Sequence, residues 1–253
     1  MTIDDKKSPP IIEAAELIPI RCLHEPINTK EQSSKHIIIL HGWNSGANDM
    51  NKMIDALLQI PNVNNYYVWS FSYETWRTGF DKAAILLENK IDQLPLHFNN
   101  TIFFTYSMGG LIARQLIANG MQCTALITIC TPHDGILPNI PLLPWDKGEK
   151  SMLKDSPQLI ALKNHPRDIS LRNVFYCFGF GYINNEGVRV CDDKIVSLPS
   201  ALANNLKGIR YSLPLYVRDR GTLDLHHLKG MDPYYCTSVF QLIDSLINRE
   251  KTA

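Results

Sequence analysis

The sequence predicts an α/β fold in which a mostly parallel sheet is covered by helices on both faces. Short apolar runs rich in β-branched and aromatic residues alternate along the chain with amphipathic segments of helical spacing. At 253 residues, of which 45% are hydrophobic, the chain is long enough to bury one large core. We expect residues 1–12 to form a flexible N-terminus and residues 13–253 to form a single domain.

The individual elements follow from local composition. Each expected strand is an apolar run, and each expected helix places leucine, isoleucine or alanine three and four residues apart. Segment 13–26 is expected to supply an edge strand, because Pro19 has no N–H to donate inside a sheet. The other expected strands span residues 36–40, 66–73, 101–106, 123–130, 173–179 and 209–217. The expected helices span residues 47–59, 79–93, 108–119 and 233–248.

The alternation breaks between residues 135 and 168. This segment is rich in proline and contains the apolar stretch 136–145 (Ile-Leu-Pro-Asn-Ile-Pro-Leu-Leu-Pro-Trp). Such a stretch is too apolar for a disordered loop. We therefore expect a long irregular insertion that resembles a lid, with a short helix within residues 152–164.

Charge and cysteine content exclude several classes of protein. The 25 basic and 25 acidic residues balance, and no basic cluster is interleaved with aromatics, so nucleic acid is not an expected partner. The six cysteines form no Cys-x-x-Cys pair, which favours free thiols over a disulfide framework. There is no apolar signal segment near the N-terminus and no run long enough to span a membrane. We therefore expect a cytoplasmic protein, with export by a signal-independent route left open.

A serine stands at the point where an expected strand turns into an expected helix. Residues 105–110 read Thr-Tyr-Ser-Met-Gly-Gly, which is typical of a nucleophile elbow centred on Ser107. Such a tight turn exposes the hydroxyl and points the N-terminus of the helix at any anion that forms there. Thr105 stands where the usual Gly-x-Ser-x-Gly pattern has its first glycine. The alternative interpretation is an ordinary strand-to-helix loop.

Two backbone N–H groups are expected to hold an oxyanion beside this serine. Acyl transfer uses the N–H of the residue after the nucleophile and one N–H from the loop after an earlier strand. Met108 and Trp43 occupy those places, and Gly42 lets the backbone approach closely. A plain turn, with His41 as a core histidine, is the alternative.

An acid and a base are expected further along the chain, in the order serine, acid, histidine. The loop after the strand that ends near residue 181 carries Asp192 and Asp193, and we favour Asp193 because Ile195 and Val196 anchor the loop behind it. Of the histidines, His226 and His227 lie after the last strand; His227 is our choice and His226 the reserve. A metal site at this pair is not expected, because no carboxylate or thiol stands at ligand spacing.

Several motifs together resemble a known group of enzymes. His41-Gly42-Trp43, Tyr106-Ser107-Met108-Gly109-Gly110-Leu111, Thr131-Pro132-His133-Asp134-Gly135 and Asp193-Lys194-Ile195-Val196 occur in that order. They resemble the α/β-hydrolase superfamily, in particular the bacterial triacylglycerol lipases and serine esterases, over residues 36–248. The chain departs from the group's pattern at Thr105, Lys194 and Ser197.

The resemblance implies an α/β-hydrolase fold and a serine hydrolase that cleaves carboxylic esters through an acyl-enzyme, without a cofactor. Ser107 would be the nucleophile, Asp193 the acid, His227 the base, and Trp43 and Met108 the oxyanion donors, while His133 would be structural. The apolar insertion favours a small-molecule acyl ester or lipid as substrate. A thioesterase, an amidase and a non-catalytic binding protein of the same fold remain alternatives. Transient contact with a lipid surface, the acyl-chain length and the oligomeric state are left open.

Overall fold

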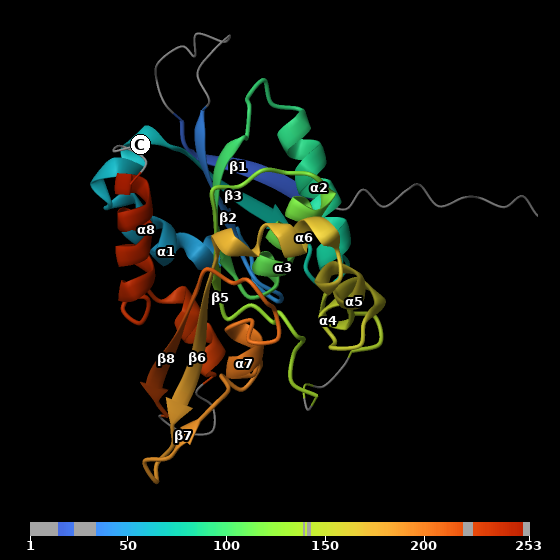
Figure 1. The fold of residues 1–253 in the computed structure, drawn as a ribbon, viewed down its shortest axis with the longest axis vertical. Helices are drawn as coiled ribbons and strands as arrows, with labels where there is room; N and C mark the ends of the chain where they lie inside the picture. Colours follow the sequence, from blue (N-terminus) through green and yellow to red (C-terminus); the bar gives the residue numbers. More distant parts are fainter. Residues whose placement is uncertain (1–14, 23–33, 139, 141–142, 220–224, 250–253) are drawn as a thin grey trace, which may run out of the picture.

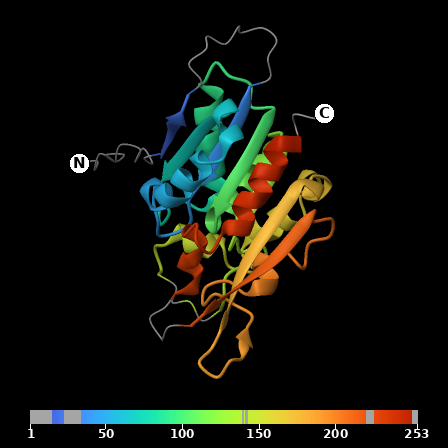
Figure 2. The same ribbon diagram turned by 90° about the vertical axis from the view of Figure 1, so that its left-hand side faces the viewer.

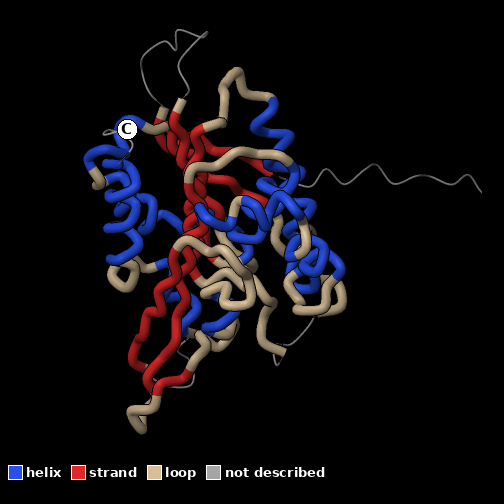
Figure 3. Tube along the Cα trace, viewed as in Figure 1, coloured by secondary structure: helices blue, strands red, loops and turns tan. Residues whose placement is uncertain are grey.

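A central sheet of eight strands organises the protein (Figures 1 and 3). The computed structural model describes residues 15–22, 34–138, 140, 143–219 and 225–249. The strands are β1 (Ala15–Arg21), β2 (Lys35–Leu40), β3 (Tyr67–Tyr73), β4 (Asn100–Tyr106), β5 (Ala125–Ile129), β6 (Phe175–Ile183), β7 (Arg189–Val190) and β8 (Tyr211–Arg218). Their order across the sheet is β1-β3-β2-β4-β5-β6-β7, and β8 pairs with β6.

The sheet is mostly parallel. Pairs β2–β3, β2–β4, β4–β5, β5–β6 and β6–β8 are parallel, whereas β1 joins β3 and β7 joins β6 in antiparallel fashion. The strand that contains Pro19 lies at the sheet edge, as expected. Because β2, β4 and β5 point the same way, the loops that follow them meet at one edge of the sheet.

Helices cover both faces of the sheet, because apolar side chains of the central strands point alternately to each face. In β2, Ile38 and Leu40 belong to one buried apolar cluster, whereas Ile37 and Ile39 belong to another. Successive side chains of a strand point to opposite faces, so a fully apolar strand needs cover on both. Helices α2 (Phe80–Asp92) and α3 (Met108–Asn119) cover one face. Helices α1 (Asn51–Leu58) and α8 (Thr237–Arg249) cover the other, which faces the viewer in Figure 2.

The insertion at residues 135–168 is more regular than we expected. It contains α4 (Lys147–Ser151) and α5 (Pro157–Lys163), followed by α6 (Pro166–Ser170). Local capping explains the difference: the side chain of Asp146 accepts a hydrogen bond from the Glu149 N–H, and the Ser156 hydroxyl accepts one from the Leu159 N–H. Prolines occupy the first turns of α5 and α6, a position at which proline starts a helix.

Short elements complete the architecture. The sequence did not lead us to expect β7 or helix α7 (Leu198–Ala201). The 3-10 helices are η1 (Ala47–Met50), η2 (Pro61–Asn65), η3 (Arg172–Val174) and η4 (His226–Met231). The expected flexible N-terminus lies outside the described residues. Among the described helices, none is both long and apolar enough to cross a membrane.

Candidate active site

Ser107 occupies a strained turn between β4 and α3. Its backbone has φ 51° and ψ −122°, in the left-handed half of conformational space that a residue with a side chain rarely adopts. Two hydrogen bonds hold the turn: the Ser107 N–H donates to the Ile129 carbonyl at 2.8 Å, and the Thr131 hydroxyl donates to the Ser107 carbonyl at 2.9 Å. This backbone geometry is typical of the strand-to-helix turn that the sequence predicts at Ser107.

The glycines of the elbow allow α3 to approach the neighbouring strands. A Cβ on Gly109 would lie 2.5 Å from the Leu40 carbonyl oxygen, and one on Gly110 would lie 2.1 Å from the Thr131 hydroxyl. Thr105, which replaces the first glycine of the usual pattern, is fully buried and donates its hydroxyl hydrogen to the Ile127 carbonyl at 2.9 Å. The extra bulk is therefore accommodated between β4 and β5 without disturbing the turn.

The structure brings Ser107, His227 and Asp193 together. His227 Nε2 lies 2.9 Å from Ser107 Oγ, and His227 Nδ1 lies 2.7 Å from Asp193 Oδ2. The other carboxylate oxygen, Asp193 Oδ1, accepts the N–H groups of Ile195 at 3.0 Å and Val196 at 2.7 Å. Both oxygens of this fully buried carboxylate thus have hydrogen-bond partners.

The two reserve residues face elsewhere. His226 is fully buried, and its Nε2 lies 3.1 Å from Asp219 Oδ1. Asp192 accepts the Lys194 N–H at 2.9 Å. The geometry therefore favours Asp193 over Asp192 and His227 over His226, since Asp193 and His227 are the pair aligned with Ser107.

The loop after β2 lies against the serine. A Cβ on Gly42 would lie 2.8 Å from Ser107 Cβ, so only glycine fits there. The Gly42 carbonyl accepts two hydrogen bonds, from His41 Nδ1 at 2.9 Å and from the Ser45 hydroxyl at 2.8 Å. The Trp43 N–H belongs to the same peptide unit and points the opposite way, so these two bonds fix its direction. Met108 begins α3, where the N–H has no partner within the helix.

The Trp43 indole is anchored to the insertion. Its Nε1–H donates to Asp146 Oδ2 at 2.7 Å, while Asp146 Oδ1 caps α4 by accepting the Glu149 N–H at 2.8 Å. Gly148 packs so closely that a Cβ there would lie 3.1 Å from Trp43 Cδ1 and 1.9 Å from the Thr75 carbonyl oxygen. Sequence analysis did not identify Asp146, because a helix-capping aspartate carries no signal for a contact 103 residues away.

A cavity of about 300 Å³ opens above Ser107 and His227. One wall is apolar and draws on three parts of the chain: the insertion, the acid loop and η4. The apolar lining residues are Ile136, Met152, Ile195, Leu225, Leu228 and Met231. Polar side chains of the β2–η1 loop and η1, including Asn44 and Asp49, also line the cavity. The cavity is suited to a small acyl group whose carbonyl reaches the serine.

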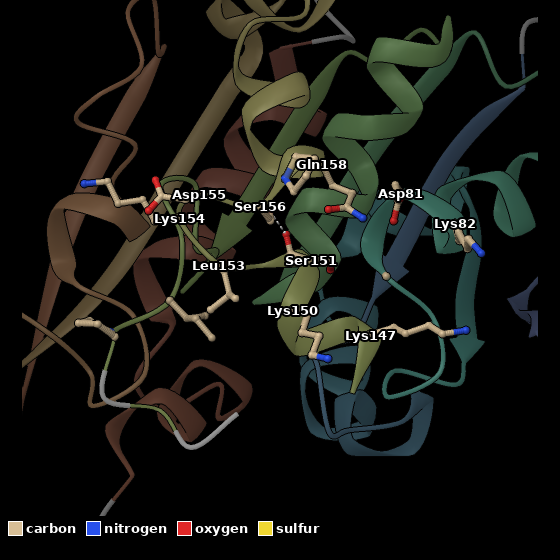
Figure 4. A pocket seen from close by; sticks show the side chains of 14 residues that line it. Asp81, Lys82, Lys147, Lys150, Ser151, Leu153, Lys154, Asp155, Ser156 and Gln158 are labelled. Atoms are coloured by element: carbon tan, nitrogen blue, oxygen red, sulfur yellow. Dashed lines mark hydrogen bonds between the residues drawn. The ribbon is translucent and has the colours of Figure 1, made fainter. Parts of the chain in front are cut away.

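A larger cleft of about 770 Å³ adjoins this cavity (Figure 4). Of the described residues, Ile136 lines both hollows, and the neighbours Met152 and Leu153 line one each. Lysines of α2, α4 and the following turn surround the cleft.

Three buried groups near the site could be taken for metal ligands. Cys130, Asp193 and His227 place ligand atoms within 4.8 Å of one another. The donor set does not fit a metal ion, because the Asp193 oxygens and His227 Nδ1 are already hydrogen-bonded. Burial, together with Asp193, raises the pKa of the Cys130 thiol well above its ordinary value, so the thiol stays protonated and is a poor ligand. His226 and His227, the pair considered from sequence, turn to different carboxylates.

His133 lies within a buried polar network and does not line the cavity above Ser107. Its Nδ1 accepts from Arg114 at 3.3 Å, and its Nε2–H donates to the Thr128 hydroxyl at 3.1 Å. Burial, followed by the Arg114 and Arg172 charges, holds the pKa of His133 well below its usual value, so the ring is neutral. Arg114 in turn forms a two-pronged ion pair with Asp168 of α6, at 2.8 and 2.9 Å. The signal we overlooked is a charged residue, Arg114, in the middle of the largely apolar helix 108–119.

The sheet topology and the serine elbow define the fold as that of an α/β-hydrolase. Among solved structures, the mature lipase BlEst2 of Bacillus licheniformis is 16% identical, with a TM-score of 0.65 over 90% of this chain and 98% of that one. The product of gene lin2722 from Listeria innocua is 14% identical, with a TM-score of 0.59 over 83% and 94%. A carboxylesterase of the thaumarchaeon Nitrososphaera gargenis is 10% identical, with a TM-score of 0.53 over 94% and 96%.

The chain belongs to the family described as "Putative serine esterase (DUF676)", which residues 30–176 match. Family membership supports ester hydrolysis as the general class of activity. The matched range includes Trp43 and Ser107 but ends before Asp193 and His227. No curated protein matches the chain in a sequence comparison.

Proposed function

We propose that the protein is a serine hydrolase that cleaves carboxylic esters through a covalent acyl-enzyme. The alignment of Ser107 Oγ, His227 and Asp193, with hydrogen bonds of 2.9 and 2.7 Å, carries this proposal. The same spatial arrangement, in which an acid orients the base that activates a nucleophile, recurs in hydrolases on unrelated folds.

In the proposed reaction, His227 Nε2 takes the hydroxyl proton as Ser107 Oγ attacks the ester carbonyl. The Met108 and Trp43 N–H groups stabilise the oxyanion, and Asp193 stabilises the protonated imidazole. His227 then gives the proton to the leaving alcohol as the C–O bond breaks. A water molecule, activated by the same imidazole, attacks the acyl-enzyme, releases the carboxylic acid and restores the Ser107 hydroxyl.

The lining of the cavity supports an acyl ester or lipid as substrate. An acyl chain that packs against Ile136, Met152 and Met231 is removed from contact with water. This transfer lowers the free energy by about 25 cal/mol for each Å² of apolar surface buried. Ile136 and Met152 bring the insertion to the edge of the site, which supports its role as a partial lid.

Labelling with a fluorophosphonate probe and hydrolysis of p-nitrophenyl butyrate test the proposal. The wild type should react with both, and Ser107→Ala with neither. Paired variants test the acid: Asp193→Asn should lower kcat by about 10³–10⁴-fold, whereas the neighbouring Asp192→Asn should stay near wild type. Equal labelling of wild type and Ser107→Ala would rule out Ser107 as the nucleophile.

The alternatives are separated by a substrate panel with matched acyl groups. Oxygen esters, thioesters and amides of butyric acid should be hydrolysed with the oxygen ester favoured. A preference for the thioester or the amide would change the class of enzyme, and no turnover of any substrate would favour a binding protein.

A further inference from the structure

The cleft next to the proposed active site has a distinctive charge. Four lysines line it, namely Lys82, Lys147, Lys150 and Lys154, against two aspartates, Asp81 and Asp155. The whole chain, by contrast, has equal numbers of basic and acidic residues. Clefts lined by an excess of one charge concentrate ligands of the opposite charge.

The lysines are spread along the cleft (Figure 4). Lys82 and Lys147 lie toward one end, Lys154 lies toward the other, and Lys150 lies between them. Lys154, whose side chain is 66% exposed, lies 3.7 Å from Asp134, and an ion pair of this length with one partner in solvent is weak. Long flexible stems allow ammonium groups at such positions to move toward a bound anion.

The cleft also has apolar lining residues, and it shares one of them with the cavity above Ser107. Pro138, Leu153 and Pro157 line the cleft, and Ile136 is shared with the cavity above Ser107. The Ile136 N–H donates to the Met152 carbonyl at 3.1 Å, which fixes this shared wall between the two hollows. Because the two hollows meet at Ile136, a ligand that extends past this residue would reach from one into the other.

The two hollows differ in size and in chemistry. The cavity at Ser107 measures about 300 Å³, and its apolar wall suits a hydrocarbon acyl group. The cleft measures about 770 Å³ and carries the lysines. An ester with its acyl group in the smaller cavity would place its alcohol portion in the larger one.

We propose that this cleft is a second substrate-binding site, which takes the negatively charged alcohol portion of an acyl ester. The group recognised is a phosphate or a carboxylate, and the scissile carbonyl lies at Ser107. This inference rests on the proposed esterase function, and it adds a substrate class: acyl esters of anionic alcohols.

Substrates with one acyl chain and different alcohols test the inference. We would compare octanoyl glycerol with octanoyl glycerol 3-phosphate and with the octanoyl ester of glyceric acid, all below the concentration at which they aggregate, and measure released octanoate. The wild type should have a higher kcat/KM for the anionic esters, and added NaCl should reduce the advantage. The phosphate arm represents a lipid headgroup, and the glycerate arm represents a small carboxylic acid.

Lysine variants locate the effect. Lys147→Gln and Lys150→Gln should each raise KM for the preferred anionic ester by about two- to five-fold and leave turnover of octanoyl glycerol unchanged. Lys52→Gln is the matched control, because Lys52 is an exposed lysine on α1, across the sheet from the cleft.

The outcomes separate the two proposals. If octanoyl glycerol is hydrolysed but neither anionic ester is preferred, the cleft proposal is wrong and the esterase proposal stands. The cleft proposal would also be wrong if Lys52→Gln reduced the preference for anionic esters as much as Lys147→Gln does. If the wild type hydrolyses neither p-nitrophenyl butyrate nor any of the three octanoyl esters, the esterase proposal itself is contradicted.

Discussion

The indole N–H of Trp43 donates a 2.7 Å hydrogen bond to the carboxylate of Asp146, which is almost fully buried. This bond connects the loop beside Ser107 to the first helix of the insertion. The insertion therefore contributes to the site twice, by lining the cavity and by holding the residue whose backbone N–H is a proposed oxyanion donor.

Breaking this bond should slow turnover without weakening substrate binding. Asparagine caps helices as well as aspartate does, so Asp146→Asn keeps the bond to the Glu149 N–H and loses the anionic acceptor for Trp43. We expect kcat to fall by about ten-fold or more with little change in KM, because small displacements of a catalytic group are costly.

A double-mutant cycle on p-nitrophenyl butyrate checks that the effect passes through Trp43. Trp43→Phe removes the indole donor but keeps the backbone N–H, so it should resemble Asp146→Asn, and the double variant should be no worse than either one. Asp155→Asn, an exposed aspartate of the same insertion, is the control. Additive effects of the two substitutions would contradict the coupling.

Gly42 should be intolerant of even one added carbon. A Cβ there would lie 2.8 Å from Ser107 Cβ and 2.9 Å from the Tyr106 ring, so Gly42→Ala must displace the loop or the serine. We expect kcat to fall by about 10²-fold. Gly46→Ala is the matched control, because a Cβ there meets nothing within 4 Å and φ is −129°. Similar kcat values for Gly42→Ala and Gly46→Ala would show that the loop can move to accommodate the added carbon without loss of activity.

The buried ion pair between Arg114 and Asp168 should matter for stability. Both side chains are fully buried, and Asp168 also pairs with Arg172 at 2.9 Å. Asp168→Asn leaves the arginine charges uncompensated, so we expect the free energy of unfolding to fall by about 3–5 kcal/mol. Urea denaturation measures it, and Asp155→Asn should change it by less than about 0.5 kcal/mol. If Asp168→Asn lowers the free energy of unfolding no more than Asp155→Asn does, the Arg114–Asp168 ion pair contributes little to stability.

Stability should also decrease in mild acid. Burial lowers the pKa values of His36 and His41 from 6.5 to about 4. The unfolded chain therefore binds more protons than the folded protein between pH 4 and 6.5, so stability falls as the pH drops through that range and is level above it. His41 alone should account for about 2 kcal/mol between pH 7 and pH 5.

His36 provides the test, because it lies away from the serine. Its Nδ1 accepts the Trp69 indole N–H at 3.2 Å, which requires the neutral ring. Urea unfolding of His36→Gln at pH 7 and pH 5 should show a smaller loss of stability than the wild type shows. If His36→Gln and the wild type lose the same free energy of unfolding between pH 7 and pH 5, protonation of His36 does not cause the loss.

The sequence predicts the strands and long helices well where local pattern and global fold agree. The apolar runs of β2 to β5 are buried on both faces, so their composition alone indicates central parallel strands. The nucleophile elbow is equally local, since strand, serine and glycines are contiguous from residue 101 to residue 110.

The insertion could not be interpreted in the same way. Prolines 157 and 166 are the first residues of α5 and α6, and a proline at that position starts a helix as readily as it ends one. At α5 the Ser156 cap before the proline marks the helix start, whereas His165 before Pro166 makes no side-chain capping bond. The contacts of Asp146 and Asp168 join segments far apart in the sequence, so no local pattern announces them.

The choice between neighbouring residues also depended on the folded chain. Asp192 and Asp193 have the same chemistry, and the turn that follows them determines which carboxylate faces His227. Backbone N–H groups at Ile195 and Val196 point at Asp193 Oδ1 and orient its other oxygen toward the imidazole. Such an orientation is a property of the loop geometry, and residue identity does not encode it.

The distance along the chain between Ser107 and His227 has a consequence for biosynthesis. The ribosome would deliver the serine 120 residues before the histidine that lies 2.9 Å from it. A nascent chain that has folded strands β2 to β5 holds the strained elbow but not its imidazole. On this geometry, the proposed triad stays incomplete until translation has passed His227.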